Sequence, residues 1–171
     1  MRKGGGKAKG AQFERDCCRM LSLWVSNGEQ EDCFWRSAMS GGRSTVAFAK
    51  GKRLTAQAGD ITCTSPTGMP FAKRFLAECK FYRDLDFLAA IDRKGRFAKF
   101  WRTISNEAVA HNRHPMLFAK QNRTPLFICL GWQGMLFLGY PTALAAITFP
   151  GIDAHLILAD RFFKECKPPR E

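Results

Sequence analysis

Near its start, the chain carries apolar residues at intervals of three and four, as one face of a helix requires. This stripe consists of Phe13, Cys17, Met20, Leu21 and Trp24. It predicts an amphipathic helix over residues 11–25, which Gly28 ends. The aromatic-rich segment Cys33–Ser37 is typical of a short strand, and the Gly- and Ser-containing stretch 38–58 after it predicts a long loop.

Two further strand-like segments follow, separated by a turn. Residues 59–64 alternate in polarity, residues 65–70 carry Ser, Pro and Gly in a turn pattern, and residues 74–81 form the return strand, so we expect a hairpin. The remaining expected elements are a helix marked by Phe97, Phe100, Trp101, Ile104 and Ala108, strands at Met116–Ala119, Leu126–Leu130 and Met135–Tyr140, and a helix at Asp160–Cys166. This order predicts an α/β (α+β) fold, with a sheet flanked by helices.

The length of 171 residues, 46% of them hydrophobic, suits one domain with its own core. The 15 Phe and 4 Trp residues offset the entropy of folding and argue against intrinsic disorder. We expect a flexible basic arm over 1–9, a single domain over 10–166 and a polar tail over 167–171. The 7 Cys residues, with no Cys-x-x-Cys pair, argue against a disulfide framework or a zinc site and favour a reducing, cytoplasmic location.

The charge of the chain points to a polyanionic partner. Its 27 Lys and Arg residues exceed its 15 Asp and Glu residues, for a net charge of +12, and nucleic acid is the commonest polyanion. A membrane is the competing partner, because residues 124–152 carry no charge. Gly and Pro divide this stretch into pieces well below the ~20 apolar residues that a span needs, and the start of the chain lacks the apolar core of a signal peptide. We therefore expect no membrane association.

Polar residues on the two expected hairpin strands form a candidate catalytic site. Glu78 and Lys80 are two residues apart in a strand and project from one face, whereas Cys79 points into the core. If the strands pair, Asp60 approaches the same face. Converging carboxylates repel each other unless a divalent cation lies between them, and oxygen ligands suit Mg²⁺ or Mn²⁺. With a lysine beside them, this arrangement suits hydrolysis of a phosphodiester.

The order Asp60, then Glu78-Cys79-Lys80, resembles the PD-(D/E)xK nuclease signature. The preceding segments strengthen the resemblance: residues 9–15 read Lys-Gly-Ala-Gln-Phe-Glu-Arg, and Trp35-Arg36-Ser37 leads to Gly59. Over residues 9–81, this order is similar to that of the archaeal-type Holliday junction resolvases and their phage-encoded relatives. The resemblance implies a single restriction-endonuclease-like domain with a central mixed sheet, Mg²⁺ or Mn²⁺ as cofactor, and a homodimer.

The resemblance also implies roles for individual residues. The implied catalytic residues are Glu14, Asp60, Glu78 and Lys80. The implied metal ligands are Glu14, Asp60, Glu78 and Cys79. Residues implied to lie near the scissile phosphate or the DNA backbone are Arg15, Arg36 and Ser37. The chain departs from the pattern at Gly59, where the motif is named for Pro, and in two loops that look longer than in compact resolvases.

Other readings remain open for some of these residues. Asp60, Glu78 and Lys80 could form a cross-strand ion pair on an exposed sheet face, worth about 0.2–1 kcal/mol. The loop 38–58 contains cations and no acid, which favours contact with the phosphate backbone over a merely solvated surface. Its cations are Arg43, Lys50, Lys52 and Arg53. His111 and His114 lie where a helix is expected to end, so capping is the simpler explanation than metal binding.

We therefore expect a metal-dependent, structure-selective endodeoxyribonuclease, and specifically a dimeric Holliday junction resolvase in DNA recombination or repair. The resemblance implies an intracellular, phage-encoded protein. A nuclease of the same fold that acts on flaps, ends or duplex DNA is the enzymatic alternative. A non-catalytic DNA-binding module of this fold is a second alternative, and it predicts salt-sensitive binding without cleavage. An RNA-binding protein would fit the charge but leaves the Glu-x-Lys pair unexplained.

Overall fold

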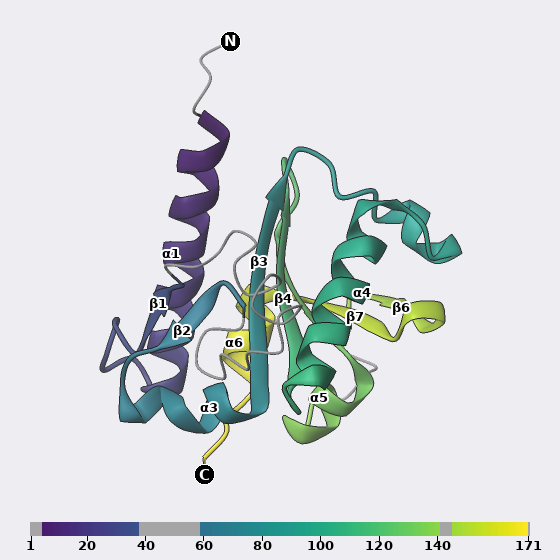
Figure 1. The fold of residues 1–171 in the computed structure, drawn as a ribbon. Coiled ribbons are helices and arrows are strands. Elements are labelled where there is room, and N and C mark those ends of the chain that lie inside the picture. Colours follow the sequence, from purple (N-terminus) through teal and green to yellow (C-terminus); the bar gives the residue numbers. More distant parts are fainter. Residues whose placement is uncertain (1–4, 38–58, 141–144, 171) are drawn as a thin grey trace.

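A mixed sheet of five strands forms the centre of the domain (Figure 1). The computed structural model describes residues 5–37, 59–140 and 145–170. The strand order is β3-β4-β5-β7-β6, in which β3 and β4 run parallel and the other neighbours run antiparallel. The strands are β3 (Phe75–Tyr82), β4 (His114–Gln121), β5 (Leu126–Leu130), β6 (Ile147–Phe149) and β7 (Ala154–Leu158). In this order β3 is an edge strand.

Helix α4 (Gly95–Ala110) connects the two parallel strands. A parallel pair needs a crossover connection, and the short 3-10 helix η2 (Leu88–Asp92) together with α4 carries the chain back across one face of the sheet. The buried residues of α4 pack on that face. They are Phe97, Ala98, Trp101, Ile104 and Ala108. The predicted amphipathic helix is confirmed, and His111 is its C-cap residue.

The opposite face is covered by α1 (Gly5–Val25) and α6 (Ala159–Glu165). The buried apolar stripe of α1 comprises Phe13, Cys17, Cys18, Leu21 and Trp24. Beside α1, β1 (Phe34–Arg36) and β2 (Ile61–Cys63) form a two-stranded antiparallel sheet (Figure 1). Helices therefore flank a central mixed sheet on both faces, and the predicted fold class is confirmed.

Helix α1 is longer than its apolar pattern indicates. It begins at Gly5 rather than near Ala11, so residues expected to belong to a flexible arm form its first turns. These turns carry no buried apolar side chain among the described residues, which is why hydrophobic periodicity did not find them.

The predicted hairpin between residues 59–64 and 74–81 is wrong. β2 pairs with β1 instead, with Arg36 opposite Ile61, and the turn contains the 3-10 helix η1 (Pro66–Gly68) and helix α3 (Met69–Arg74). Pro70 lies in the first turn of α3, where its missing N–H costs nothing. The turn residues were correctly located, but they begin a helix.

The strand predicted at Met135–Tyr140 is also wrong, because this segment belongs to helix α5 (Trp132–Phe137). Gly139 follows with φ of 63°, and the Tyr140 amide donates to the Met135 carbonyl, as at many helix C-termini. The predictions for β4 and β5 are confirmed, whereas β6 and β7 were not predicted. Among the described residues, no helix has the length and apolar composition to cross a membrane.

Candidate active site

Glu78 and Lys80 lie together on the edge strand β3. They share a face with Leu76, which packs in the α4 cluster, while Cys79 faces the other way. The Cys79 thiol is buried in the same core cluster as Cys17 of α1. The alternation of the strand therefore exposes two polar groups to the site and buries the residue between them, as predicted.

Asp60 is fixed against the free edge of β3. Its amide donates to the carbonyl of Ala77 at 3.1 Å, and its carbonyl accepts from the amide of Ser37 at 2.7 Å. Its carboxylate Oδ2 accepts from the amide of Cys79 at 2.9 Å. Because the N–H and C=O of one strand residue point to the same edge, the Cys79 carbonyl also faces the side on which Asp60 lies.

Gly59 makes this close approach possible. Its φ is +84°, and a Cβ atom at this position would lie 2.5 Å from the carbonyl oxygen of Ala77. Proline fixes φ near −65°, so it does not fit here. Glycine rather than the proline of the motif's name therefore precedes Asp60 for a local steric reason. Gly59 adopts a left-handed backbone conformation and packs directly against β3.

The ammonium of Lys80 lies between the two carboxylates. Its Nζ is 3.4 Å from Oδ2 of Asp60 and also contacts Oε1 of Glu78. Burial, and then repulsion from Asp60, raise the pKa of Glu78 to about 8. Burial alone lowers the pKa of Lys80, but the attraction of Glu78 and Asp60 outweighs it and raises that pKa. The electrostatics of the pocket thus favour a cation beside the carboxyl groups of Asp60 and Glu78.

Glu14 reaches the same pocket from α1. Its Oε2 accepts a hydrogen bond from Nε of Arg36 at 2.8 Å, and the Glu14 side chain is only 16% exposed. Arg36 is the last residue of β1, so this ion pair joins α1 to the small sheet. Arg36 therefore orients an acid of the pocket.

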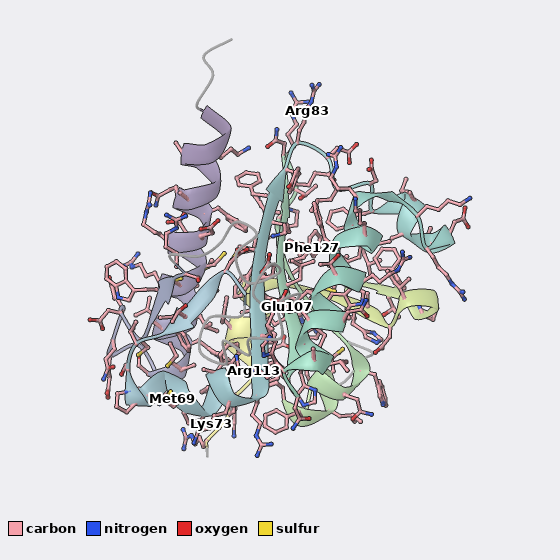
Figure 2. The ribbon with its side chains drawn as sticks, in the orientation of Figure 1. Met69, Lys73, Arg83, Glu107, Arg113 and Phe127 are labelled. Carbon is pink, nitrogen blue, oxygen red and sulfur yellow. The ribbon has the colours of Figure 1, made fainter. Side chains whose placement is uncertain are left out.

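The pocket is lined by the N-terminal half of α1 and the C-terminal half of β3. Its volume is about 690 Å³. Its lining residues are Gly6, Lys9, Gly10, Glu14, Asp60, Glu78, Cys79, Lys80, Phe81, Tyr82 and Arg83. In Figure 2, Arg83 lies at this end of the sheet, whereas Met69 and Lys73 lie at the opposite end. All four residues expected to be catalytic line this one pocket.

The residues expected to contact DNA are placed differently. Arg15 is exposed on α1 and donates to Oε1 of Gln12 at 2.7 Å, and it does not line the pocket. Ser37 is buried beside the main chain of Asp60. The cations of the basic loop lie outside the described residues: Arg43, Lys50, Lys52 and Arg53.

The oxygen atoms of the site fit a hard divalent cation. Among the described residues, no three His, Cys, Asp or Glu side chains gather into a metal-binding group. The thiol of Cys79 is turned into the core, so the carbonyl is the atom of this residue that can serve as a ligand. The carboxylates of Asp60 and Glu78, with this carbonyl, could supply part of an oxygen shell, which would suit Mg²⁺ or Mn²⁺ because these ions retain waters.

Sequence reasoning missed several pocket residues, chiefly Lys9, Tyr82 and Arg83. Lys9 could have been found from helical spacing, since it lies four residues, about one turn, before the buried Phe13. Tyr82 follows from the strand period, because it shares a face with Glu78 and Lys80.

A mixed sheet between helices, with an acid before one strand and Glu-x-Lys on the edge strand, defines the class: a PD-(D/E)xK domain with a restriction-endonuclease-like fold. The model of one family within this class, described as "Phage putative PDDEXK endonuclease", matches residues 5–150. The chain belongs to this family, which indicates a nuclease and implies DNA as its substrate. Neither the comparison with curated proteins nor that with solved structures found a match.

Proposed function

We propose that this chain is a divalent-metal-dependent endodeoxyribonuclease that hydrolyses phosphodiester bonds. The observation that carries the proposal is the convergence of Asp60, Glu78 and Lys80 in a pocket that Glu14 also lines. A surface ion pair explains this less well, because the side chains of Asp60 and Glu78 are only 10% and 21% exposed. Enclosed like charges are costly without a function that uses them.

Each group has a role in this chemistry. Asp60, Glu78 and the Cys79 carbonyl would hold the cation, and Glu14 adds a further negative charge to the pocket. Bound Mg²⁺ or Mn²⁺ would polarise the phosphate and lower the pKa of an attacking water. Lys80 orients that water or stabilises the negative charge that develops on the phosphate. Water forms a bond to phosphorus, the P–O bond of the leaving strand breaks, and the leaving oxygen takes up a proton.

For the substrate, we propose a branched DNA, most specifically a four-way junction cut by a resolvase. The support is the resemblance of residues 9–81 to the resolvases, together with the basic composition of the chain. Flaps, ends and duplex DNA are the alternative substrates for the same chemistry.

The test compares a labelled four-way junction, a flap and a linear duplex of matching sequence. Each is incubated with the protein in Mg²⁺, in Mn²⁺ and in EDTA. Lys80→Ala tests the site, and Lys73→Ala serves as the matched control because Lys73 is exposed at the opposite end of the sheet (Figure 2). We expect paired nicks on the junction that require metal and Lys80 but not Lys73.

The other outcomes decide between the alternatives. Equal cutting of all three substrates retains the nuclease and rejects junction selectivity. Salt-sensitive binding without cleavage in either metal supports the non-catalytic module instead. Cleavage by Lys80→Ala at the natural rate rejects the assignment of the site.

Paired nicks also require two active sites, so the proposal includes a homodimer. Helix α5 supplies a candidate surface, because Trp132, Leu136 and Phe137 are 45%, 54% and 40% exposed. Light scattering at assay concentration tests this part, and a monomeric mass together with junction cutting would reject the dimer. Leu136→Glu should give the monomer if α5 is the surface.

A further inference from the structure

The ends of three segments meet at one end of the catalytic pocket. They are the start of α1, the end of β3 and the turn between β4 and β5. We call Lys9, Arg83, Asn122 and Arg123 the distal cluster. Nζ of Lys9 donates to the side-chain Oδ1 of Asn122 at 2.8 Å, and the backbone N–H of Asn122 donates to the backbone carbonyl of Tyr82 at 3.2 Å. These bonds join all three segments.

The side chain of Lys9 is held in place rather than free to move in solvent. Its ammonium lies 3.6 Å from the centroid of the Phe81 ring, and Phe81 packs edge-on against Phe13 at 5.3 Å. A cation fixed by an aromatic ring and an amide has already lost side-chain entropy, so it binds an anion with a smaller ordering cost. Only part of the ammonium's hydrogen-bonding capacity is used, because it has three donors.

The cations of the distal cluster are not neutralised by acids. Among residues 5–37, 59–140 and 145–170, the ion pairs involve Arg19, Arg36, Lys80, His155 and Arg161, and none involves a distal-cluster cation. Asp84 is the acid next to Arg83 in the chain, and its Oδ1 accepts from the amide of Asp86 at 2.9 Å. The distal cluster therefore presents excess positive charge at one end of the pocket.

The distal cluster lies close to the catalytic residues along both elements. Lys9 precedes Glu14 by five residues, about 7.5 Å along a helix. Arg83 follows Cys79 by four residues, about 13 Å along a strand. Phosphates of one strand are spaced about 3.4 Å along the duplex axis. On α1 itself, a Cβ atom added at Gly6 or Gly10 would meet no atom within 4 Å, so this side of the pocket is open.

We propose that the distal cluster binds the sugar–phosphate backbone of the cleaved DNA strand, within a few nucleotides of the scissile phosphate. Lys9 and Arg83 are the principal contacts, and they act as positioning residues that set where the strand enters the pocket. The inference rests on the proposed function for the identity of the scissile position, although it concerns binding and not the chemical step.

The test measures binding of the junction and of a linear duplex in EDTA, which separates binding from cleavage. The double variant Lys9→Ala/Arg83→Ala is compared with Lys73→Ala/Arg74→Ala, a matched pair of exposed cations on α3 at the opposite end of β3. Each phosphate contact contributes about 0.9 to the slope of log affinity against log salt on duplex DNA. We expect the slope of the first variant to be shallower by about 1.8, and that of the control to be unchanged.

A second measurement locates the contact. Single phosphates of the cleaved strand are replaced in turn by neutral methylphosphonates, and binding is compared between the natural protein and Lys9→Ala/Arg83→Ala. Neutralising the contacted phosphates should weaken binding of the natural protein and leave that of the variant unchanged. Melting temperatures of both double variants check that each is folded.

The outcomes separate this inference from the proposed function. A changed slope in a protein that cleaves nothing supports the distal cluster and rejects the nuclease. Cleavage in Mg²⁺ with an unchanged slope in the variant retains the nuclease and overturns the distal cluster. If the slope of the α3 control changes as much as that of Lys9→Ala/Arg83→Ala, binding is diffuse and the inference is also overturned.

Discussion

Two substitutions of Asp60 separate its structural role from its role in metal binding. In the natural protein, the backbone N–H of Cys79 donates to Oδ2 of Asp60 at 2.9 Å. Asp60→Asn keeps an oxygen acceptor for this N–H but removes the negative charge. Asp60→Ala removes both. We expect the two variants to differ in stability and to be alike in losing cleavage.

The expected magnitudes follow from the contacts. In Asp60→Ala, the amide of Cys79 loses its partner at a site where Asp60 is 7% exposed, which costs about 1–3 kcal/mol. For a domain of this size, that lowers the melting temperature by about 2–4 °C per kcal/mol. In Asp60→Asn, a charged hydrogen bond becomes neutral, but the repulsion that raises the pKa of Glu78 is also relieved. These effects oppose each other, so we expect a change within about 1 kcal/mol.

Metal binding distinguishes the natural protein from both variants. A ligand at ten times its Kd stabilises the folded state by about 1.4 kcal/mol. The natural protein should therefore melt several degrees higher in Mn²⁺ than in EDTA, and both Asp60 variants should lose this increment. Loss of the cation removes several kcal/mol of transition-state stabilisation, so cleavage should fall by about 100-fold or more.

The assay is a thermal melt of the three proteins, with and without Mn²⁺, beside a single-turnover cleavage measurement. An Asp60→Asn protein that keeps the full Mn²⁺ increment and the natural cleavage rate would refute the metal-binding role. An Asp60→Ala protein as stable as Asp60→Asn would refute the buried hydrogen bond to Cys79. The two results are independent, so one role can fail while the other stands.

Three further predictions concern neighbouring residues. In EDTA, Glu78→Gln should gain stability relative to the natural protein as pH rises from 4.5 to about 8. Over this window the unfolded chain releases the Glu78 proton while the folded protein retains it, so the natural protein loses stability and the variant, which has no proton to release here, does not. Urea denaturation at pH 5 and pH 8 measures the difference, and an equal difference at both pH values would contradict the raised pKa. Cys79→Ala should keep the natural cleavage rate and lose about 1 kcal/mol of stability, because the thiol is buried in the core cluster that includes Cys17 and only the carbonyl faces the site. A large loss of cleavage in a folded variant would instead assign the thiol a role. Gly10→Ala should raise the free energy of unfolding by about 0.5–1 kcal/mol, because alanine favours a helix more than glycine does and a Cβ there meets no atom within 4 Å. A drop in stability would show that α1 is not helical at this position.

The part of the site that was predictable from the sequence is the part governed by short-range geometry. Glu78 and Lys80 share a face because a strand has a period of two, and this holds whatever the partner strand is. The same rule buries Cys79. Phe13 and Cys17 bury one face of α1 because a helix repeats every 3.6 residues, and this places Glu14 at the border of the core.

The pairing of Asp60 with β3 was not predictable in the same way. Its position depends on contacts between distant segments, in which Gly59 packs on Ala77 and the Ser37 amide binds the Asp60 carbonyl. A hairpin was expected because turn residues separate the two segments, yet Pro70 begins a helix in that turn. The hypothesis that Asp60 approaches Glu78 survived the wrong pairing, because Asp60 reaches the edge of β3 without a hairpin.

Helix α5 shows a second limit of sequence patterns. Met135–Tyr140 is a short apolar run, and periodicity cannot distinguish a buried strand from a buried helix over so few residues. The distinguishing signal was the stop after the run, since Gly139 adopts a left-handed conformation and Pro141 follows it in the sequence. Had the glycine and proline after the run been given more weight than its apolar character, the segment would have been predicted as a helix.

The charge arrangement of the site links its stability to its chemistry. Asp60 and Glu78 repel each other, and in the protein alone the Lys80 ammonium lies between them and offsets part of that repulsion. In the proposed mechanism, a bound divalent cation would add the remaining positive charge, so the ammonium would no longer have to neutralise both carboxylates and could turn toward the phosphate. The lysine that stabilises the metal-free fold would then be the one that assists the reaction. It follows that Lys80→Ala should lose stability in EDTA and regain much of it in Mn²⁺ while remaining inactive, a combination that a purely structural ion pair does not produce.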